Sequence, residues 1–466
     1  MSRTILVDDF IDEQKLGWFN LRLLAFSFLA MFADGYEINA LSLAAPELRS
    51  LWHLAPAAFT PALTASSFGI LLGAPLLGYV GDRNGRKSAI LIGSLICGAS
   101  TLCIVWAQSL TQIIALRFVT GIGIGGLMPN TIALNAEFSP RRWRATLVVL
   151  MFAGITLGGG VPGLVARWLV PRHGWTILFL VGGLVPLTVA ACLWFVLPES
   201  IKFLALHGQR QSELIRIARQ VRPDLAIDED SRWLVPRAFA ASGTGLPQIF
   251  GPGLRWITPL LWACFATALM TNYFLNSWLP LLGTASGLTG PEAGTAASFY
   301  SIGGAIGGVF MSVLIDRFGF LVVAALFALA APMIAAIGFT GMAYSTLLPL
   351  AAVSGLGVLG AQFGNNAAAG LLYPTPFRSK GVGWALGFGR FGSILGQSLG
   401  GVLIALHLPV RTLFLAAAAP MIVGASAAAV LVPLCYRRLG SLTLHEVPQS
   451  AAPGAVAAVA SGQAAP

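Results

Sequence analysis

Long apolar stretches alternate with short polar loops along almost the whole chain. Each stretch of about 20 residues is long enough to cross a hydrocarbon core about 30 Å thick as a helix. About twelve such stretches occur, at roughly 20–43, 60–81, 88–107, 113–135, 145–170, 174–197, 254–283, 292–315, 320–341, 344–372, 381–406 and 410–435. The pattern predicts an all-α integral membrane protein with about twelve transmembrane helices.

Two short loop motifs occur twice, 234 residues apart. They are Asp-Arg-x-Gly at 82–85 and 316–319, and Pro-x-x-x-Arg at 140–144 and 374–378. Parallel repeats of half a chain are typical of transporters in which one half rocks against the other. We therefore expect two pseudo-symmetric halves of six helices each.

The expected halves are residues 1–197 and 254–440, with a cytoplasmic linker at 198–253 between them. The linker is polar and nearly balanced in charge, which is typical of a tether. Within it, the sequence that starts at Glu213 predicts a short surface helix. The tail at 441–466 is rich in Ala, Gly, Pro and Ser, so we expect it to be disordered and cytoplasmic.

Glycine pairs with i, i+4 spacing recur in every third apolar stretch. They are Gly69/Gly73, Gly154/Gly158, Gly303/Gly307, Gly304/Gly308 and Gly392/Gly396/Gly400. Small residues at this spacing allow membrane helices to approach closely. Their regular recurrence favours helix contacts between the two halves.

The composition supports a membrane location, and the charges indicate a topology. Hydrophobic residues make up 56% of the chain and charged residues 10%, and the mean hydropathy is +0.79. The net charge of +10 could suggest nucleic-acid binding. However, 22 of the 28 Lys and Arg residues fall on one side of the predicted membrane. By the positive-inside rule this side and both termini are cytoplasmic, and no nucleic-acid partner is expected.

Two carboxylates lie within the first apolar stretch, Asp34 and Glu37. Their i, i+3 spacing places them on one helix face. Ionisable groups at bilayer depth are costly and mark ion or proton routes, whereas acids at a helix end would only reach for the interface. Because desolvation and a neighbouring like charge disfavour the ionised form, one of the pair is expected to take up a proton near neutral pH.

Arg117 and Arg390 are the two cations predicted at bilayer depth. An arginine there pairs with an acid, a carbonyl or an anionic substrate. Arg117 could pair structurally with Asp34 or Glu37 or take part in coupling, and Arg390 could capture a carboxylate or fix a helix contact. Polar and aromatic residues of the second half could line a cavity for a flat ring, or simply join helices. They are Asn272, Tyr273, Asn276, Trp278, Tyr300, Gln362, Asn365 and Asn366.

The loop after the second stretch reads Gly-Tyr-Val-Gly-Asp-Arg-Asn-Gly-Arg-Lys at 78–87. It resembles the Gly-x-x-x-Asp-Arg-x-Gly-Arg-Lys loop between helices two and three of the major facilitator superfamily. Asn84 replaces the usual aromatic residue, and the second copy has Ser312 in place of the first glycine. The resemblance implies the major facilitator fold. The expected gating residues are Gly78, Asp82, Arg83, Gly85, Arg86, Lys87, Glu137, Arg144, Asp316, Arg317 and Arg378.

Asp82, Arg86 and Glu137 are predicted to form a cytoplasmic charge cluster that closes one side when the halves rock outward. The first-stretch motif, Asp-Gly-Tyr-Glu at 34–37, resembles the Asp-Gly-Phe/Tyr-Asp motif of the aromatic acid:proton symporter family. Glu37 keeps the charge of the family's second Asp on a longer arm. Further similarity to this family covers 128–130, 137–145, 198–204 and 373–393.

This resemblance implies a secondary active transporter of the bacterial cytoplasmic (inner) membrane. It would import an aromatic carboxylate such as benzoate or hydroxybenzoate together with protons, with Asp34 and Glu37 coupling the two. No enzymatic activity, cofactor or metal is expected, and a monomer is favoured. The candidate substrate-binding residues are Arg390, Arg117, Tyr36, Asn130, Asn272, Asn276, Trp278, Tyr300, Gln362 and Asn366.

Several alternatives remain open from the sequence. The substrate could be another organic anion, such as nicotinate or a dicarboxylate. Proton-antiport drug export ranks lower, because residues 158–163 lack the Gly-Pro then Gly-Gly pattern of antiporter families. No P-loop sequence is present, which disfavours ATP-driven export. A membrane sensor of the same fold would need a signalling domain, for which the sequence gives no sign.

Overall fold

The computed structural model describes residues 4–207, 210–225, 227, 232–235, 249–251, 253–373 and 378–439. The predicted tail at 441–466 and much of 226–252 lie outside these residues. Twelve long helices fill most of the described chain. The first six are α2 (Trp18–Trp52), α3 (Thr60–Asn84), α4 (Arg86–Cys103), α5 (Leu110–Glu137), α6 (Arg141–Trp168) and α8 (Thr176–Val196). The second six are α11 (Ile257–Ala285), α12 (Gly290–Phe318), α13 (Phe320–Phe339), α14 (Tyr344–Leu372), α15 (Arg378–Ala405) and α16 (Val410–Leu439).

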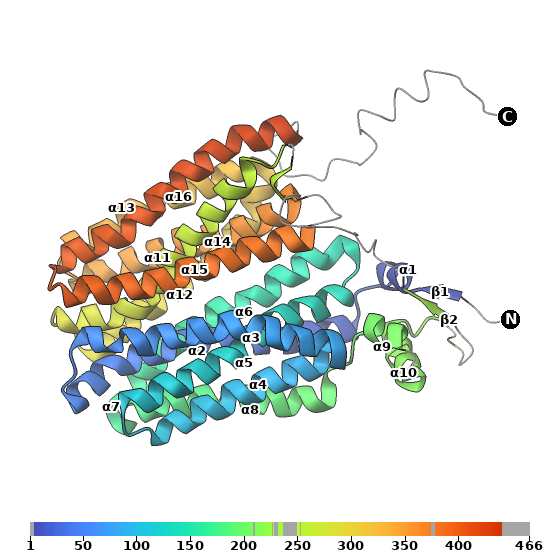
Figure 1. Cartoon of the computed structure of the whole chain (residues 1–466), viewed down its shortest axis with the longest axis horizontal. Coiled ribbons are helices and arrows are strands. Elements are labelled where there is room, and N and C mark those ends of the chain that lie inside the picture. The colour runs from blue at the N-terminus through green and yellow to red at the C-terminus, as the bar shows by residue number, and fades with distance from the viewer. Residues whose placement is uncertain are drawn as a thin grey trace.

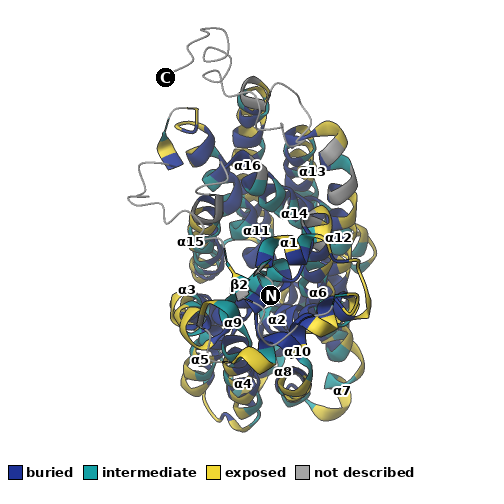
Figure 2. Cartoon of the chain, turned by 90° about the vertical axis from the view of Figure 1, so that its right-hand side faces the viewer, coloured by how far each residue is buried: buried dark blue, intermediate teal, exposed yellow. Residues whose placement is uncertain are grey.

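Within the described residues, nine of these helices are long and apolar enough to cross a membrane. Large apolar side chains lie exposed on their outer faces, for example Leu72, Trp194 and Phe195. The exposed positions follow the rim of the helix assembly and the buried ones its interior (Figure 2). A helix assembly with an apolar outer surface suits a bilayer, so the predicted fold class is confirmed.

The six helices of each half pack in the same pattern. In the N-terminal half α2 packs on α6, α3 on α5 and α4 on α8. In the C-terminal half α11 packs on α15, α12 on α14 and α13 on α16, in the same order along the chain. The two halves lie one above the other in Figure 1. This correspondence agrees with the repeat of the loop motifs.

The glycine pairs pack helices inside each half, so the prediction that they join the two halves is wrong. Gly69 and Gly73 of α3 lie against the backbone of α5, and Gly154 and Gly158 of α6 lie against α2. In the other half, the glycines of α12 face α14 and those of α15 face α11. Glycine spacing marks a face on which a helix can be approached closely, but it does not identify the approaching helix.

Part of the predicted linker folds against the N-terminal half, together with the start of the chain. Strand β1 (Thr4–Leu6) pairs in parallel with β2 (Arg232–Leu234), and helices α1 (Val7–Asp12), α9 (Ile201–His207) and α10 (Gln211–Val221) pack beside them. We call these five elements the cap; they gather at one end of the molecule (Figure 1).

The cap is held by apolar and polar contacts, so this part of the linker is not a loose tether. Phe10 and Ile215 belong to one buried cluster with helix residues of the N-terminal half. Lys202 Nζ lies 2.6 Å from Asp8 Oδ1. The predicted surface helix at Glu213 is confirmed as α10, which buries an apolar face.

Hydrogen bonds join the two halves at the end remote from the cap. Arg167 Nη1 at the end of α6 donates to Thr295 Oγ1 near the start of α12, over 2.9 Å. Ser67 Oγ of α3 donates to Gln397 Oε1 of α15, over 2.8 Å. Each bond crosses from one half to the other. The first joins α6 to α12, and the second joins α3 to α15. They hold this end of the molecule together.

Candidate functional site

Helix α2 carries both acids into the interior. Gly35 brings its backbone against Ile155 of α6, where a Cβ would collide with the carbonyl group. The neighbouring Asp34 and Glu37 are consequently buried. The predicted acid pair therefore lies inside the protein and not at a helix end.

Glu37 is neutralised by Arg117 of α5. Arg117 Nη1 lies 3.1 Å from Glu37 Oε2 and also donates to the main-chain oxygen of Glu37 over 3.1 Å. Arg117 Nη2 donates to Ser66 Oγ over 3.2 Å. Both charged side chains are buried, and a buried pair of this kind is retained because either partner alone would be a costly unpaired charge. Of the partners predicted for Arg117, the structure selects Glu37.

Asp34 and Arg390 are the other acid and cation of the site, and they influence each other electrostatically without a direct ion pair. Asp34 Oδ1 is buried and has no hydrogen-bond partner among the described residues, and Asp34 interacts electrostatically with Arg390 and with Glu37. Arg390 Nη1 donates to Tyr273 OH over 2.9 Å, and its Nη2 contacts Met128 Sδ at 3.5 Å. A thioether is a weak acceptor. The Arg390 guanidinium thus retains the capacity to bind an anion.

Polar atoms of three amide side chains of α14 lie buried without partners among the described residues. Gln362 Oε1, Asn366 Oδ1 and both polar atoms of Asn365 make no hydrogen bond within the described part of the chain. Two of these residues, Gln362 and Asn366, are predicted substrate contacts. Buried amides are nearly always paired. Such a cluster is therefore a good candidate for ligand contact.

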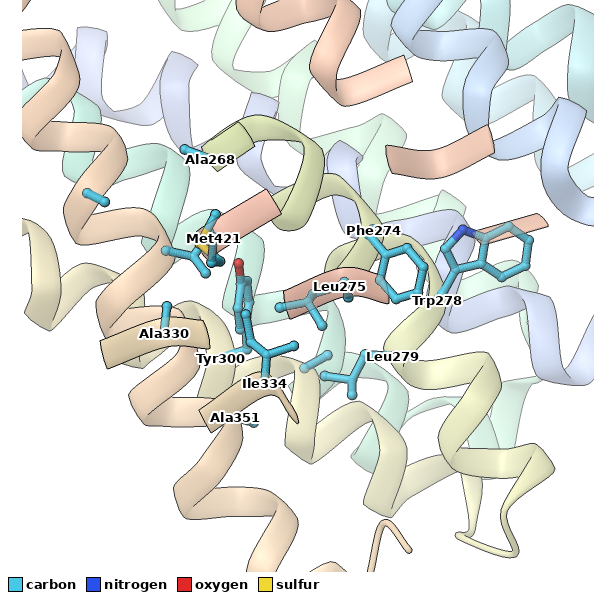
Figure 3. Close-up of a cluster of buried hydrophobic side chains, with 14 of the residues drawn as sticks. Ala268, Phe274, Leu275, Trp278, Leu279, Tyr300, Ala330, Ile334, Ala351 and Met421 are labelled. Carbon is cyan, nitrogen blue, oxygen red and sulfur yellow. The ribbon is translucent and has the colours of Figure 1, made fainter. Parts of the chain in front are cut away.

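Other predicted substrate contacts are already engaged inside the protein. Trp278 and Tyr300 sit in the packed apolar core of the C-terminal half (Figure 3). Trp278 Nε1 donates to Gln397 O over 2.9 Å, and Tyr300 OH donates to Asn272 Oδ1 over 2.9 Å. Asn276 also donates to Asn272 Oδ1, over 2.8 Å. These contacts join α11 to its neighbours.

Tyr36 and Asn130 likewise point elsewhere. Tyr36 OH donates to the carbonyl of Leu178 in α8 over 3.0 Å, inside the N-terminal half. Asn130 Nδ2 donates to Leu77 O over 3.2 Å, and its Oδ1 accepts from Arg86 Nη1 over 3.2 Å. Asn130 thereby belongs to the loop motif between α3 and α4 and not to the neighbourhood of Asp34.

The structure brings the predicted charge cluster together at the cap end. Arg86 Nη2 lies 2.7 Å from Asp82 Oδ1, and Arg86 Nε lies 3.8 Å from Glu137 Oε1. Glu137 in turn accepts from Ser200 Oγ, just before α9. The motif loop is thus tied through Glu137 to the start of the cap.

Glu199 is a member of this cluster that the predicted site omitted. It is buried, and its Oε1 accepts from the main-chain N–H groups of Lys87 and Ser200 over 3.2 and 2.9 Å. Burial raises the pKa of Glu199 above its usual range, and these N–H donors oppose the shift. Gly85 has a φ of +98°, and a Cβ there would collide with the Glu199 carboxylate. Glu199 therefore occupies the N-terminus of α4, where an anion is favoured.

The remaining motif residues are peripheral to this cluster. Arg83 Nη1 donates to Tyr79 OH over 3.0 Å, Lys87 Nζ donates to Trp194 O over 2.8 Å, and Arg144 Nη2 donates to Ser139 O over 3.2 Å. A Cβ added at Gly78 would meet open space among the described residues. Arg317 stacks on Phe318. The side chains of Asp316 and Arg378 lie outside the described part of the structure.

Gln397 is a buried connector that the sequence analysis overlooked. Besides accepting from Ser67, it donates through Nε2 to Ser277 Oγ over 3.1 Å, so it joins α3, α15 and α11. Its signal in the sequence is a lone amide in an otherwise apolar and glycine-rich segment. A polar group at bilayer depth needs a partner, and this rule applies to amides as well as to charges.

Comparison with known proteins agrees with this architecture. The model of the Major Facilitator Superfamily matches residues 27–330 and 261–458. The gallate transporter of Pseudomonas putida is 34% identical over 409 residues, which cover 88% of this chain and 91% of the relative. The benzoate transport protein of Acinetobacter baylyi is 31% identical over 432 residues, covering 91% and 92%. The 4-hydroxybenzoate transporter of Pseudomonas putida is 32% identical, covering 87% and 91%.

The chain belongs to the Major Facilitator Superfamily, and it is a membrane transporter rather than an enzyme. Its fold resembles the partially occluded inward-open structure of the xylose transporter of Escherichia coli, with a TM-score of 0.68. The match covers 93% of this chain and the whole of the other, at 14% sequence identity. At this identity the likeness concerns the fold alone.

Proposed function

We propose that this protein imports an aromatic carboxylate together with protons by alternating access. The observation that carries the proposal is the arrangement around Asp34 and Arg390. A buried acid with an unpartnered oxygen lies within electrostatic range of a half-buried cation that no acid contacts among the described residues. An aromatic substrate is supported by the relatives that transport gallate, 4-hydroxybenzoate and benzoate.

Arg390 binds the carboxylate of the substrate in this proposal. Its guanidinium presents several N–H donors in a planar fork that matches a carboxylate. One donor is held by Tyr273 OH, which fixes the orientation of the group. Arg117 is less suitable, because Glu37 already neutralises it in a buried ion pair.

Asp34 carries the coupled proton. While the site is empty, the positive charge of Arg390 attracts the carboxyl group of Asp34. A substrate anion that binds Arg390 competes for that charge, which favours protonation of Asp34. Glu37 and Arg117 do not take part in this exchange in our proposal; their ion pair joins α2 to α5. Binding of the anion and uptake of the proton are thereby linked.

The energetics favour more than one proton. A benzoic acid titrates near pH 4, as Asp and Glu do, so it arrives as an anion at neutral pH. The inside-negative potential opposes its entry by about 2.3 kcal/mol per charge per 100 mV. One proton cancels this charge and leaves only the pH gradient as the driving force. A second proton would allow the potential itself to drive uptake.

We infer that the cap lies on the cytoplasmic side of a bacterial inner membrane, with both chain termini. The 22 basic residues assigned to that side support this orientation. The cluster of Asp82, Arg86 and Glu137 lies within the N-terminal half and is formed together with the bonds on the opposite side. We propose that it acts as a cytoplasmic gate by contacting the C-terminal half when the halves rock outward. The hydrogen bonds of Arg167 and Gln397 close the opposite side while the cytoplasmic side is open. We expect a monomer.

Uptake of labelled acids by cells that express the chain tests the proposal. The panel consists of benzoate, 4-hydroxybenzoate, gallate, vanillate and nicotinate, each with and without a protonophore. We expect protonophore-sensitive accumulation of at least one benzoic acid. Accumulation that is insensitive to the protonophore would contradict proton coupling, and uptake of nicotinate alone would contradict a benzoate-like substrate.

A further inference from the structure

The unpartnered amides of α14 are the strongest anomaly that the transport cycle leaves unexplained. Asn365 is fully buried, and neither its Oδ1 nor its Nδ2 has a partner among the described residues. Gln362 Oε1 and Asn366 Oδ1 share this condition. A buried amide without a hydrogen bond is strongly unfavourable. Three of them within five positions of one helix suggest a ligand that completes them.

These amides face away from the helices that pack most closely on α14. Gly364 lies against Met311 of α12 and Val323 of α13, and the Phe363 ring lies against Gly308 of α12. A helix turns by 100° per residue. The side chains at 362 and 366 are therefore directed some 160° away from α13, toward the interior of the protein. Asn365, one position after Gly364, is directed about 100° away from it, on the side of α14 opposite Phe363.

Helix α11 fixes the level of the amides along the membrane normal, because α14 is linked to it directly at one end of this stretch and through Tyr300 of α12 at the other. Tyr373, at the end of α14, interacts with Trp262. Gly355, about two turns before Gln362, lies against Tyr300, which bonds to Asn272. The three amides fall between these two anchor points. They are therefore level with 262–272 of α11.

Arg390 lies at the same level. On either side of it, Gly389 and Gly392 of α15 lie against Phe265 and Ala266 of α11. Its guanidinium extends from there to Tyr273 OH. The candidate carboxylate site and the amides consequently share one depth in the C-terminal half. A flat ring in the interior at this depth can present its carboxylate to one and its substituents to the other.

We propose that Gln362, Asn365 and Asn366 form a subsite for a hydroxyl group on the ring of the transported acid. This inference rests on the proposed function and names a narrower substrate class, the phenolic acids. Three amide oxygens and the NH2 group of Asn365 suit a hydroxyl, which both donates and accepts. A second carboxylate would face mainly amide oxygens, and an unsubstituted ring edge would leave all the amides unpaired. The subsite therefore disfavours acids with a second carboxylate and acids with an unsubstituted ring.

Binding of radiolabelled 4-hydroxybenzoate and benzoate to the purified full-length protein tests the subsite. We expect the wild type to bind 4-hydroxybenzoate at least about tenfold more tightly than benzoate, as one good hydrogen bond to an otherwise unpaired group allows. Asn365→Leu, Gln362→Leu and Asn366→Leu remove the amides one at a time. Each should weaken 4-hydroxybenzoate binding and leave benzoate binding equal or tighter, so that the preference shrinks.

Phe363→Leu is the matched control, because Phe363 lies within the same turn but faces α12. It should leave the preference for 4-hydroxybenzoate unchanged. Retained benzoate binding by the leucine variants demonstrates that they are folded. Equal binding of the two acids by the wild type, or equal weakening of both by all three variants, would overturn the subsite and leave the proposed function standing. Binding of neither acid by the wild type would instead overturn the proposed function.

Discussion

The two halves of the molecule share a helix arrangement but handle charge in opposite ways. In the N-terminal half the buried arginine is paired with an acid of the protein, since Arg117 Nη1 lies 3.1 Å from Glu37 Oε2. In the C-terminal half Arg390 has only a tyrosine hydroxyl and a thioether as side-chain partners among the described residues. The first arrangement stabilises the protein in the absence of ligand, whereas the second leaves a cation available for one. We therefore expect a division of labour between the halves, with proton chemistry in one and anion binding in the other.

Loss of Arg390 is expected to break this division most severely. Arg390→Ala should weaken the binding of an aromatic acid by roughly 100-fold, because a charge-assisted pair of hydrogen bonds is lost. Arg390→Lys should retain part of the affinity, since the charge remains but the planar fork does not. Binding of a labelled acid to purified protein measures both.

Arg411→Ala provides the control for Arg390. Arg411 lies in the same half, where its guanidinium stacks 4.0 Å from the Phe339 ring centroid. We expect its removal to leave binding of the acid intact. Undiminished affinity in Arg390→Ala would move the carboxylate site elsewhere, with Arg117 as the next candidate.

Removal of the coupling acid should separate binding from energy use. Asp34→Asn is expected to abolish uphill uptake while substrate exchange across the membrane at equal concentrations continues. Such exchange needs the conformational change but no net proton movement. Glu47→Gln changes an acid near the C-terminal end of α2. Cells with this variant should accumulate substrate as those with the wild type do. Full protonophore-sensitive accumulation by Asp34→Asn would remove Asp34 from the coupling mechanism.

The charges of the site were the part most open to prediction from sequence. An ionisable residue at bilayer depth must find a partner or a function. Because this rule is local, it identified Asp34, Glu37, Arg117 and Arg390 without any knowledge of the fold. It could not decide which acid Arg117 contacts, because residues 80 positions apart along the chain meet only through the packing of α2 on α5.

The partners of the glycine faces could not be predicted for a related reason. Gly69 and Gly73 predict a close helix contact, yet α3 contacts α5 through one face and α15 through another. The spacing describes the glycine-bearing helix only, so the assignment to the other half failed. For the linker, by contrast, a usable signal was present. Leu214, Ala218 and Val221 follow the helical period, and this amphipathic pattern explains why α10 packs on the protein.

The stability of the N-terminal pair offers a further test of the contrast between the halves. Arg117→Met should destabilise the protein by about 3–5 kcal/mol, because it leaves the buried Glu37 without its cation. Thermal unfolding in detergent should show a clearly lower midpoint. The double variant Arg117→Met/Glu37→Gln should recover most of that loss. Arg390→Met, tested alongside, should cost much less, since no acid contacts Arg390 among the described residues. Equal losses for the two arginines would contradict the contrast.

The smallest effect is expected at the loop that the two halves share as a repeated motif. Asp82 lies 2.7 Å from Arg86 but is 68% exposed, and exposed ion pairs contribute only about 0–1 kcal/mol. Asp82→Asn should therefore leave the unfolding midpoint almost unchanged. If the cluster closes the cytoplasmic side, the same small energy biases the equilibrium between the two conformations and slows turnover about fivefold at most. Substrate affinity should stay the same, because the loop is remote from Arg390.

Arg83→Ala, which removes the neighbouring exposed cation bonded to Tyr79, is the control and should turn over normally. Weaker binding with unchanged turnover of bound substrate in Asp82→Asn would show that the loop shapes the binding site and is not a gate.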